Sequence, residues 1–250
     1  MNEWLNDFKT AVAFLTRLPM PHPQGPMPQN FVRAHRMFPV VGALIGAVVG
    51  LTCLGLRYLG VPELAAAALA LGAGAILTGA LHEDGLADVA DGFGGGRDRA
   101  AKLEIMRDSR LGTYGALILL VSFAAKLSAL AAIPDGYVVP GLIAAHALAR
   151  GILPSMSLNM PYARNDGLAR NAGQPDAATA AIAAGLALML ALVSLSWSNA
   201  LLSALAAGLS GLGIACLAQR QIGGQTGDVL GGAEQVGETA ILVLLAARLA

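Results

Sequence analysis

Three aspartates, Asp84, Asp88 and Asp91, follow directly on an apolar run at 62–81. In a helix with ~100° per residue, Asp88 is turned about 40° from Asp84, and Asp91 about 20° to the other side, so the carboxylates share one face. Near the bilayer centre each unpaired charge would cost roughly 2.5–3.5 kcal/mol. A cation held between them would offset that cost, and oxygen ligands select a hard ion such as Mg²⁺. The alternative is a solvated helix end whose acids complement the dipole. The two neighbouring glycines and the apolar flanks favour the metal site.

A polar connection at 82–111 contains these aspartates and several cationic side chains. Cationic donors neutralise phosphate oxygens, and the glycines at 93–96 could let backbone amides approach an anion. A helix-like stretch follows at 100–107. The alternative is a solvated basic loop whose charges pair with neighbouring acids, which we favour for Arg97 and Arg99. The candidate substrate-binding residues of this connection are His82, Lys102, Arg107, Asp108 and Arg110.

A second polar segment, at 223–234, has glycines on both sides of Thr226 and Asp228. Glycines would let a phosphate approach the backbone, Thr226 could bind it, and Asp228 could join the metal ligands as a fourth carboxylate. The alternative is a glycine-rich turn between two helices. Asp228 favours a site, because it is the only acid between Asp176 and Glu234.

His146 and Arg150 lie one helical turn apart inside an apolar run. Ionisable groups at membrane depth are rare, so such a pair is more typical of a functional or helix-bridging role than of a lipid-facing one. We therefore count Arg150 among the candidate substrate-binding residues. The segment at 162–170 is a further candidate for substrate contact, although its Asn-Asp-Gly is also typical of an ordinary turn.

The composition is that of an integral membrane protein. Of the 250 residues, 56% are hydrophobic and 13% charged, with a mean hydropathy of +0.63, whereas soluble domains have about 25% charged residues. The net charge of zero gives no indication of nucleic acid binding. Cys53 and Cys216 both lie in apolar runs, so we expect no structural disulfide. Charged residues interrupt the apolar pattern at 4–18, so we expect no cleavable signal.

The hydrophobic pattern predicts an all-α fold, a polytopic transmembrane helix bundle with about seven spans and an N-terminal amphipathic interfacial helix. The interfacial helix, at 2–18, has an apolar stripe that includes Val12 and Leu15. The prolines that follow it at 19–28 exclude regular structure as far as about residue 30. The expected spans are 38–59, 62–81, 112–133, 137–156, 177–195, 199–218 and 236–249.

The distribution of basic residues predicts the orientation. If the seven spans alternate in direction, one side of the membrane carries every Lys and Arg except Arg57, Lys126 and Arg248. The positive-inside rule makes this side cytoplasmic, and the aspartate, glycine-rich and 162–170 motifs all lie on it. We find no internal repeat or low-complexity linker, so we expect one domain. Its parts are the N-terminal segment 1–36, the bundle 37–250, and the cytoplasmic loops 82–111, 157–176 and 219–235.

Taken together, these motifs resemble the cobalamin synthase family, the adenosylcobinamide-GDP ribazoletransferases of bacterial inner membranes. The resemblance runs through residues 14–19, 36–42, 82–92, 104–112 and 224–231. It therefore covers most of the chain, and the two central motifs are specific to the family.

The resemblance implies a reaction that the residues alone do not name. A hydroxyl of α-ribazole, or of its 5′-phosphate, attacks the phosphoryl group attached to cobinamide, GMP leaves, and the product is adenosylcobalamin or its phosphate. Mg²⁺ is required. Asp84, Asp88 and Asp91 would hold one or two Mg²⁺ ions, with Asp91 as a candidate for taking the hydroxyl proton, and the cationic residues named above would bind phosphates or GMP. Thr226 and Asp228 would close the site. Association into homo-oligomers, or with other enzymes of the pathway, is left open.

Two other functions compete with this interpretation. A CDP-alcohol phosphotransferase of phospholipid synthesis uses similar chemistry, but it normally carries an Ala-Arg pair and two later aspartates spaced by four. Here Ala87 precedes Asp88, and no aspartate occurs at 92–95. A divalent-cation transporter should place acids at mid-membrane in several spans. Here the acids cluster at one interface beside cationic residues, which favours a phosphorylated substrate.

Overall fold

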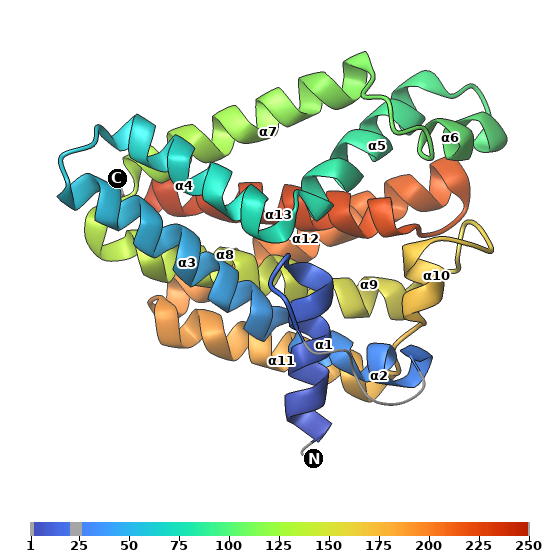
Figure 1. The fold of residues 1–250 in the computed structure, drawn as a ribbon, viewed down its shortest axis with the longest axis horizontal. Coiled ribbons are helices and arrows are strands. Elements are labelled where there is room, and N and C mark those ends of the chain that lie inside the picture. Colours follow the sequence, from blue (N-terminus) through green and yellow to red (C-terminus); the bar gives the residue numbers. More distant parts are fainter. Residues whose placement is uncertain (1–2, 21–26, 250) are drawn as a thin grey trace.

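The computed structural model describes residues 3–20 and 27–249, and all regular elements in these ranges are helices. Most of the long helices run lengthwise through the molecule, and the short helices α6 and α10 lie at the same end (Figure 1). In chain order the helices are α1 (Glu3–Leu15), α2 (Met27–Ala34), the 3₁₀-helix η1 (His35–Met37), α3 (Phe38–Tyr58), α4 (Glu63–Thr78), α5 (Leu81–Gly95), α6 (Arg99–Ile105), α7 (Thr113–Ala132), α8 (Asp135–Gly151), α9 (Leu153–Asn159), α10 (Leu168–Ala172), α11 (Ala177–Ser194), α12 (Trp197–Ile222) and α13 (Gly227–Leu249).

Within the described ranges, six helical segments are long and apolar enough to cross a membrane, which confirms the expected polytopic bundle. α4 and α5 are together apolar enough for a further span, but the pair is bent by 91°, as in a broken span or a re-entrant loop. The outer helices α7 and α12 expose large apolar side chains such as Leu120 and Leu209, as helices in contact with lipid do. The expected spans 38–59, 112–133 and 177–195 match α3, α7 and α11 to within one residue at each end.

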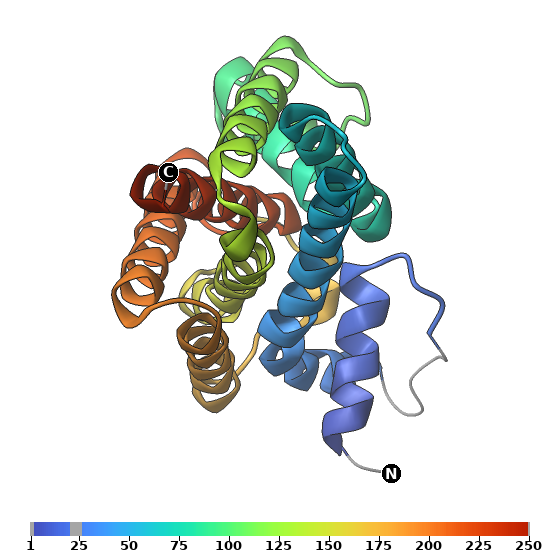
Figure 2. The same ribbon diagram turned by 90° about the vertical axis from the view of Figure 1, so that its left-hand side faces the viewer.

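α8 lies inside the bundle and is surrounded by α3, α11 and α13 (Figure 2). Three glycines of α3 face it at helical spacing: Gly42, Gly46 and Gly50. A Cβ on Gly46 would overlap the Leu142 carbonyl group, and one on Gly50 would lie 2.8 Å from the Val139 Cα. Small residues at these positions therefore let the two backbones touch, as in many membrane bundles.

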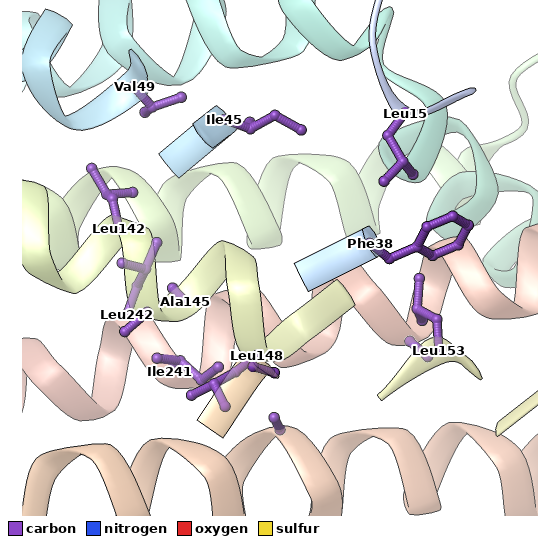
Figure 3. Close-up of a cluster of buried hydrophobic side chains, with 14 of the residues drawn as sticks. Leu15, Phe38, Ile45, Val49, Leu142, Ala145, Leu148, Leu153, Ile241 and Leu242 are labelled. Atoms are coloured by element: carbon purple, nitrogen blue, oxygen red, sulfur yellow. The ribbon is translucent and has the colours of Figure 1, made fainter. Parts of the chain in front are cut away.

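The apolar core forms around this contact. Ile45 and Val49 of α3, Leu142 of α8, and Ile241 and Leu242 of α13 belong to one buried cluster, in which Leu142 lies beside Leu242 (Figure 3). These side chains are buried in protein rather than turned to lipid. The core thus fixes the position of α13 relative to α8.

We expect Gly46→Ala to lower the free energy of unfolding by about 1–3 kcal/mol, because the added methyl group forces α3 and α8 apart. The matched control is Gly55→Ala on the same helix, where a Cβ meets no described heavy atom within 4 Å. Alanine's helix propensity should leave that variant neutral or up to ~1 kcal/mol more stable. Thermal unfolding of the detergent-solubilised protein measures both. Equal melting temperatures would contradict the backbone contact.

The N-terminal helix predicted at 2–18 is α1, and part of its apolar stripe packs on protein, since Val12 and Leu15 are buried. Asp7 is also buried, and its Oδ2 lies 2.5 Å from Nη2 of Arg36. Two charges therefore attach α1 to the segment before α3. The placement of α1 on a membrane surface stays a prediction.

The expected absence of regular structure as far as residue 30 is wrong from Met27 onward, where α2 begins. Pro28 falls in its first turn, where a proline is tolerated because the missing N–H has no partner within the helix. Residues 21–26, with three of the prolines, lie outside the described residues.

The last two helices are longer than predicted. Residues 219–235 are expected as a cytoplasmic loop, but α12 continues to Ile222 and α13 begins at Gly227. The polar residues near the start of α13 were interpreted as loop because their buried partners on other helices cannot be read from the local pattern. The span expected at 137–156 likewise divides at Ile152 into α8 and α9.

The bend between α4 and α5 depends on two residues with left-handed backbone conformation, Gly79 (φ 67°) and Ala80 (φ 55°). Gly79 accommodates this conformation readily, whereas Ala80 is the one non-glycine residue with positive φ in the described ranges. The bend ends α4 and turns α5 towards the start of α13. It therefore decides where the aspartates lie.

Candidate active site

α5 carries the three aspartates at helical spacing, as the sequence predicts. Asp84 is exposed, Asp88 is half-buried and Asp91 is buried. The segment 93–96, whose glycines were expected to let backbone amides approach an anion, is helical as far as Gly95. The acidic face therefore leads from an open surface into the bundle.

Glycines bring α5 and α13 into close contact at this face. A Cβ on Gly85 would lie 2.9 Å from the Asp228 carbonyl oxygen, and one on Gly231 would lie 3.3 Å from the His82 Cα. A larger residue at either position would separate the helices and move Asp228 away from α5. Gly231 thus has a packing role, and phosphate approach at the other glycines of 223–234 stays a prediction.

Asp228 joins the aspartates of α5 in one electrostatic cluster. Asp88 interacts with the charges of Asp84, Asp228 and Asp91, and with that of Arg164. Arg164 is the nearest cation, and its Nη2 donates to Oδ2 of Asp228 at 3.3 Å. Three or four carboxylates around one guanidinium leave excess negative charge, which is the electrostatic requirement of a divalent-cation site.

Thr226 lies beside this cluster. Its hydroxyl donates to Oδ2 of Asp228 at 3.1 Å and accepts from the Val229 N–H at 3.2 Å, so it caps the first turn of α13. The cap fixes Asp228 at the start of the helix. The structure therefore gives Thr226 a positioning contact, and its contact with substrate stays a prediction.

Asp91 connects α5 to the beginning of α7. Its two oxygens accept hydrogen bonds from the backbone N–H groups of Gly112 and Gly115, both at 2.8 Å. A Cβ on either glycine would overlap the carboxylate. The Gly-x-x-Gly spacing at the start of α7 is therefore the sequence signal of this contact, in which a helix N-terminus binds an anion. The roles of Asp91 as metal ligand and base stay predictions.

The candidate cations after α5 pair with acids or amides of neighbouring segments. Arg107 binds Asp166 at 2.6 Å, and Asp166 lies 3.8 Å from Nε of Arg164, so ion pairs run from the 105–112 segment to the aspartate cluster. Arg110 pairs with Asp108, and this hydrogen bond lowers the pKa of the exposed Asp108 carboxyl.

Lys102 hydrogen-bonds Gln221 at the end of α12. Arg99, which the sequence assigned to a solvated loop with acidic partners, instead donates to the carbonyl oxygens of Ile222 and Ala163 at 2.7 and 2.5 Å. These contacts attach α6 to the loops around Asp228. Substrate contact by Lys102, Arg107 and Arg110 stays a prediction.

His82 and Arg150 converge on a buried acid, Glu234 of α13. Nδ1 of His82 lies 3.2 Å from one carboxylate oxygen, and Nη1 of Arg150 lies 2.5 Å from the other. One turn further along α13, Glu238 binds Nδ1 of His146 at 2.9 Å and Nζ of Lys126 at 3.1 Å. All of these side chains are buried. They form one network, the α13 network, composed of His82, Lys126, His146, Arg150, Glu234 and Glu238.

The sequence interpretation missed the α13 network. It assigned Glu234 to a loop, named no partner for Glu238 inside the span expected at 236–249, and left Lys126 off the basic side. The available signal was the i, i+4 spacing of Glu234 and Glu238, which places both on one face of a helix. The expectation that the acids cluster at one interface is therefore wrong for Glu234 and Glu238, which are buried within α13.

Charge balance decides what the α13 network can bind. His146, Glu234 and Glu238 are close enough to hold a metal ion. However, Lys126 and Arg150 already balance the two carboxylates, so a divalent cation would add uncompensated charge in a buried site. Because its carboxylates are already paired, the α13 network does not provide a path for divalent cations. The aspartate cluster, with its excess of acids, is the better metal site.

Comparison with known proteins agrees with these motifs. A family model described as cobalamin-5-phosphate synthase matches residues 7–246. Three proteins named adenosylcobinamide-GDP ribazoletransferase are similar to the chain. The one from Bradyrhizobium diazoefficiens is 46% identical over 96% of this chain and 93% of its own length. Those from Sinorhizobium medicae and Rhizobium etli are both 43% identical, over 98% and 100% of this chain and 98% and 99% of their own. No solved structure matches. The chain belongs to the cobalamin-5-phosphate synthase family.

Proposed function

We propose that this chain transfers the phosphocobinamide part of adenosylcobinamide-GDP to α-ribazole, or to its 5′-phosphate, with release of GMP. The observation that carries the proposal is the meeting of Asp84 and Asp88 with Asp228 and Arg164, from three separate segments. Family membership names the reaction, and this cluster supplies groups suited to a phosphoryl centre.

The carboxylates of the cluster fit Mg²⁺, because oxygen donors outnumber the one nearby cation. Asp84, Asp88 and Asp228 would hold the ion, and Asp91 has lone pairs left to join them. Bound there, Mg²⁺ would neutralise charge on the diphosphate and orient it for attack. Arg164 supplies a donor for phosphate oxygens beside Asp228.

The exposed side chains of Arg107 and Arg110 lie after α6, where they could bind the leaving GMP. Asp91 holds the first turn of α7 in place, and so fixes the chain that follows Arg110. Family membership does not favour a CDP-alcohol phosphotransferase or a cation transporter.

The decisive experiment incubates the purified protein with adenosylcobinamide-GDP, α-ribazole and Mg²⁺. We expect GMP and adenosylcobalamin to form in equal amounts, as measured by mass spectrometry. Omission of α-ribazole should abolish both products, and chelation of divalent ions should do the same if the cluster binds Mg²⁺. A parallel reaction with a CDP-activated lipid and a free alcohol tests the rival function. Product in that reaction alone would overturn the proposal.

We further propose that the aspartate cluster faces the cytoplasm at the inner membrane. At the opposite end of the bundle, Arg57 pairs with Asp135 at 2.7 Å, so the connections after α3 and after α7 share one side. The positive-inside rule places that basic-poor side outside the cell.

Single cysteines at positions 107, 166, 135 and 196, in a Cys53→Ser/Cys216→Ser background, test this orientation. In sealed vesicles of known sidedness we expect positions 107 and 166 to react only with reagent on the cytoplasmic side. Positions 135 and 196 should react only from the other side. If 107 and 166 labelled from opposite sides, the ion pair between Arg107 and Asp166 could not exist in the membrane.

A further inference from the structure

A cavity of about 550 Å³ lies between α3, α4 and α7, above α8 and α13. Leu120 and Phe123 line its mouth and are 67% and 43% exposed, as expected of side chains that face lipid. Its floor is polar and buried, with Lys126, His146 and Arg150 each at most 5% exposed. The cavity therefore leads from an apolar opening to hydrogen-bonding groups of the α13 network.

The floor includes buried nitrogens that lack a hydrogen-bond partner among the described residues, Nε2 of His146 and Nε of Arg150. Nδ1 of His146 lies 2.9 Å from both Glu238 and Arg150, but the buried Nε2 has no hydrogen-bond partner among the described residues. A buried polar atom left unpaired costs about 1–3 kcal/mol. A ligand that offers one complementary polar atom at this point would remove that cost.

The cavity and the aspartate cluster with its contacts lie on the same two helices, α5 and α7. On α5, Glu83 lines the cavity and its neighbour Asp84 belongs to the cluster. On α7, Ala116 lines the cavity one residue after Gly115, whose N–H binds Asp91. Neighbouring residues of the same two helices therefore line the cavity and carry the cluster or its contacts.

The α13 network also connects the two places. His146 lies on the cavity floor, Arg150 and Glu234 follow it, and His82 ends the chain of contacts. His82 lines a smaller pocket of about 90 Å³ together with Asp84 and Asp228. Binding in the cavity can thus act on the geometry of the cluster through paired charges.

We propose that this cavity binds the dimethylbenzimidazole base of the acceptor nucleoside, with Nε2 of His146 hydrogen-bonded to the free ring nitrogen. The inference rests on the proposed function. The base is flat, uncharged and largely apolar, which matches apolar walls and a network whose charges are already balanced. A cavity of about 150 Å³ already binds benzene, so this one has room for two fused rings and part of the ribose.

A lipid acyl chain fits this cavity less well. Its methylene groups would lie against Lys126, His146 and Glu238 and leave the histidine nitrogen unpaired. The aspartate cluster, in turn, is open and acidic and offers an apolar base little contact. The two halves of the nucleoside therefore match two different surfaces, the base the cavity and the ribose the cluster.

The first test fills the cavity by Ala75→Phe on α4, with Ala65→Phe as control, an exposed position of the same helix outside the cavity lining. In steady-state assays of the full-length protein in nanodiscs, we expect Ala75→Phe to raise KM for α-ribazole at least ~10-fold, which corresponds to about 1.4 kcal/mol. KM for adenosylcobinamide-GDP should change less than about twofold on the same scale. Ala65→Phe should leave both unchanged.

The second test addresses His146 without enlarging any side chain. His146→Asn keeps a polar atom near the position of Nδ1 and removes Nε2, whereas His146→Gln does the reverse. We expect His146→Asn to raise KM for α-ribazole by roughly five- to tenfold, the loss of one hydrogen bond. His146→Gln should weaken the protein's thermal stability more, because it disturbs the contacts to Glu238 and Arg150.

Direct binding separates this inference from the proposed function. Free 5,6-dimethylbenzimidazole, titrated into the wild-type protein and followed by its own fluorescence, should bind and should not bind to Ala75→Phe. If wild-type protein turns over but both variants keep the wild-type KM for α-ribazole, the cavity assignment is overturned and the function stands. If Ala75→Phe instead changes only the dependence of activity on lipid composition, an acyl chain occupies the cavity. If wild-type protein shows no turnover, the function fails, and with it the identity of the ligand.

Discussion

Replacing Asp88 by asparagine is expected to lower kcat at least ~100-fold while the protein still inserts and folds. Asp88 interacts with the charges of the three other acids of the cluster, Asp84, Asp91 and Asp228. It is therefore the natural centre of the metal site. Removing one carboxylate ligand takes away part of the charge stabilisation of the transition state, and ~100-fold corresponds to ~2.7 kcal/mol. The same change at Asp84 should have a similar effect.

Turnover is measured as GMP release at saturating substrates and Mg²⁺. The control is Glu63→Gln, an exposed acid in the first turn of α4 at the opposite end of that helix, which should keep wild-type activity. If the aspartates were only a solvated helix end, Asp88→Asn would retain activity and gain stability as repulsion is relieved. Activity close to that of the wild type in both Asp84→Asn and Asp88→Asn would end the shared-metal hypothesis.

Much of the fold follows from patterns that act locally. Apolar runs of about 20 residues must be helices in a bilayer, because the backbone has no other source of hydrogen bonds there. The expected helices at 38–59 and 177–195 therefore match α3 and α11 closely. Local spacing also predicted that Asp84, Asp88 and Asp91 share one face of a helix, because the intervals between them are close to the helical repeat.

What the pattern did not reveal depends on partners far away in the chain. Glu234 and Glu238 are tolerated inside α13 only because Arg150 and Lys126 from α8 and α7 neutralise them. A local hydropathy pattern records the cost of these acids but not their partners, so the predicted helix began nine residues too late, at 236 instead of Gly227. The contact of Asp91 with the start of α7 is of the same kind, because it joins groups more than 20 residues apart.

The contact of Arg164 with Asp228 is a part of the site that the sequence could not predict. The sequence left 162–170 open between a turn and a substrate contact. The structure places Arg164 against Asp228 because Gly224 lies so close to Pro161 that the two loops pair through Gln225. A Cβ on Gly224 would overlap the Pro161 carbonyl oxygen. Only the fold could reveal that the two motifs meet.

The second large effect expected is strong coupling between Asp88 and Asp228, which lie on α5 and α13, far apart in the chain. We expect each alanine substitution to reduce kcat ~100-fold, and the double variant to be scarcely worse than the poorer single one. Groups that hold one metal and one diphosphate act as a unit. The first substitution therefore already removes their joint contribution to kcat, and the second removes little more. Independent contributions would instead multiply to a loss of roughly 10⁴-fold.

Four kcat values, measured at saturating Mg²⁺ with enough enzyme for the residual rates, give the interaction energy. The matched control combines Asp88→Ala with Glu63→Ala, a pair from opposite ends of the bent α4–α5 segment, where the effects should add within about 0.5 kcal/mol. Additivity for Asp88 and Asp228 would remove Asp228 from the site. Gly85 and Gly231 hold the two helices together. If the two aspartates are instead coupled, Gly231→Leu should lower kcat as much as the loss of Asp228, since it separates the same two carboxylates.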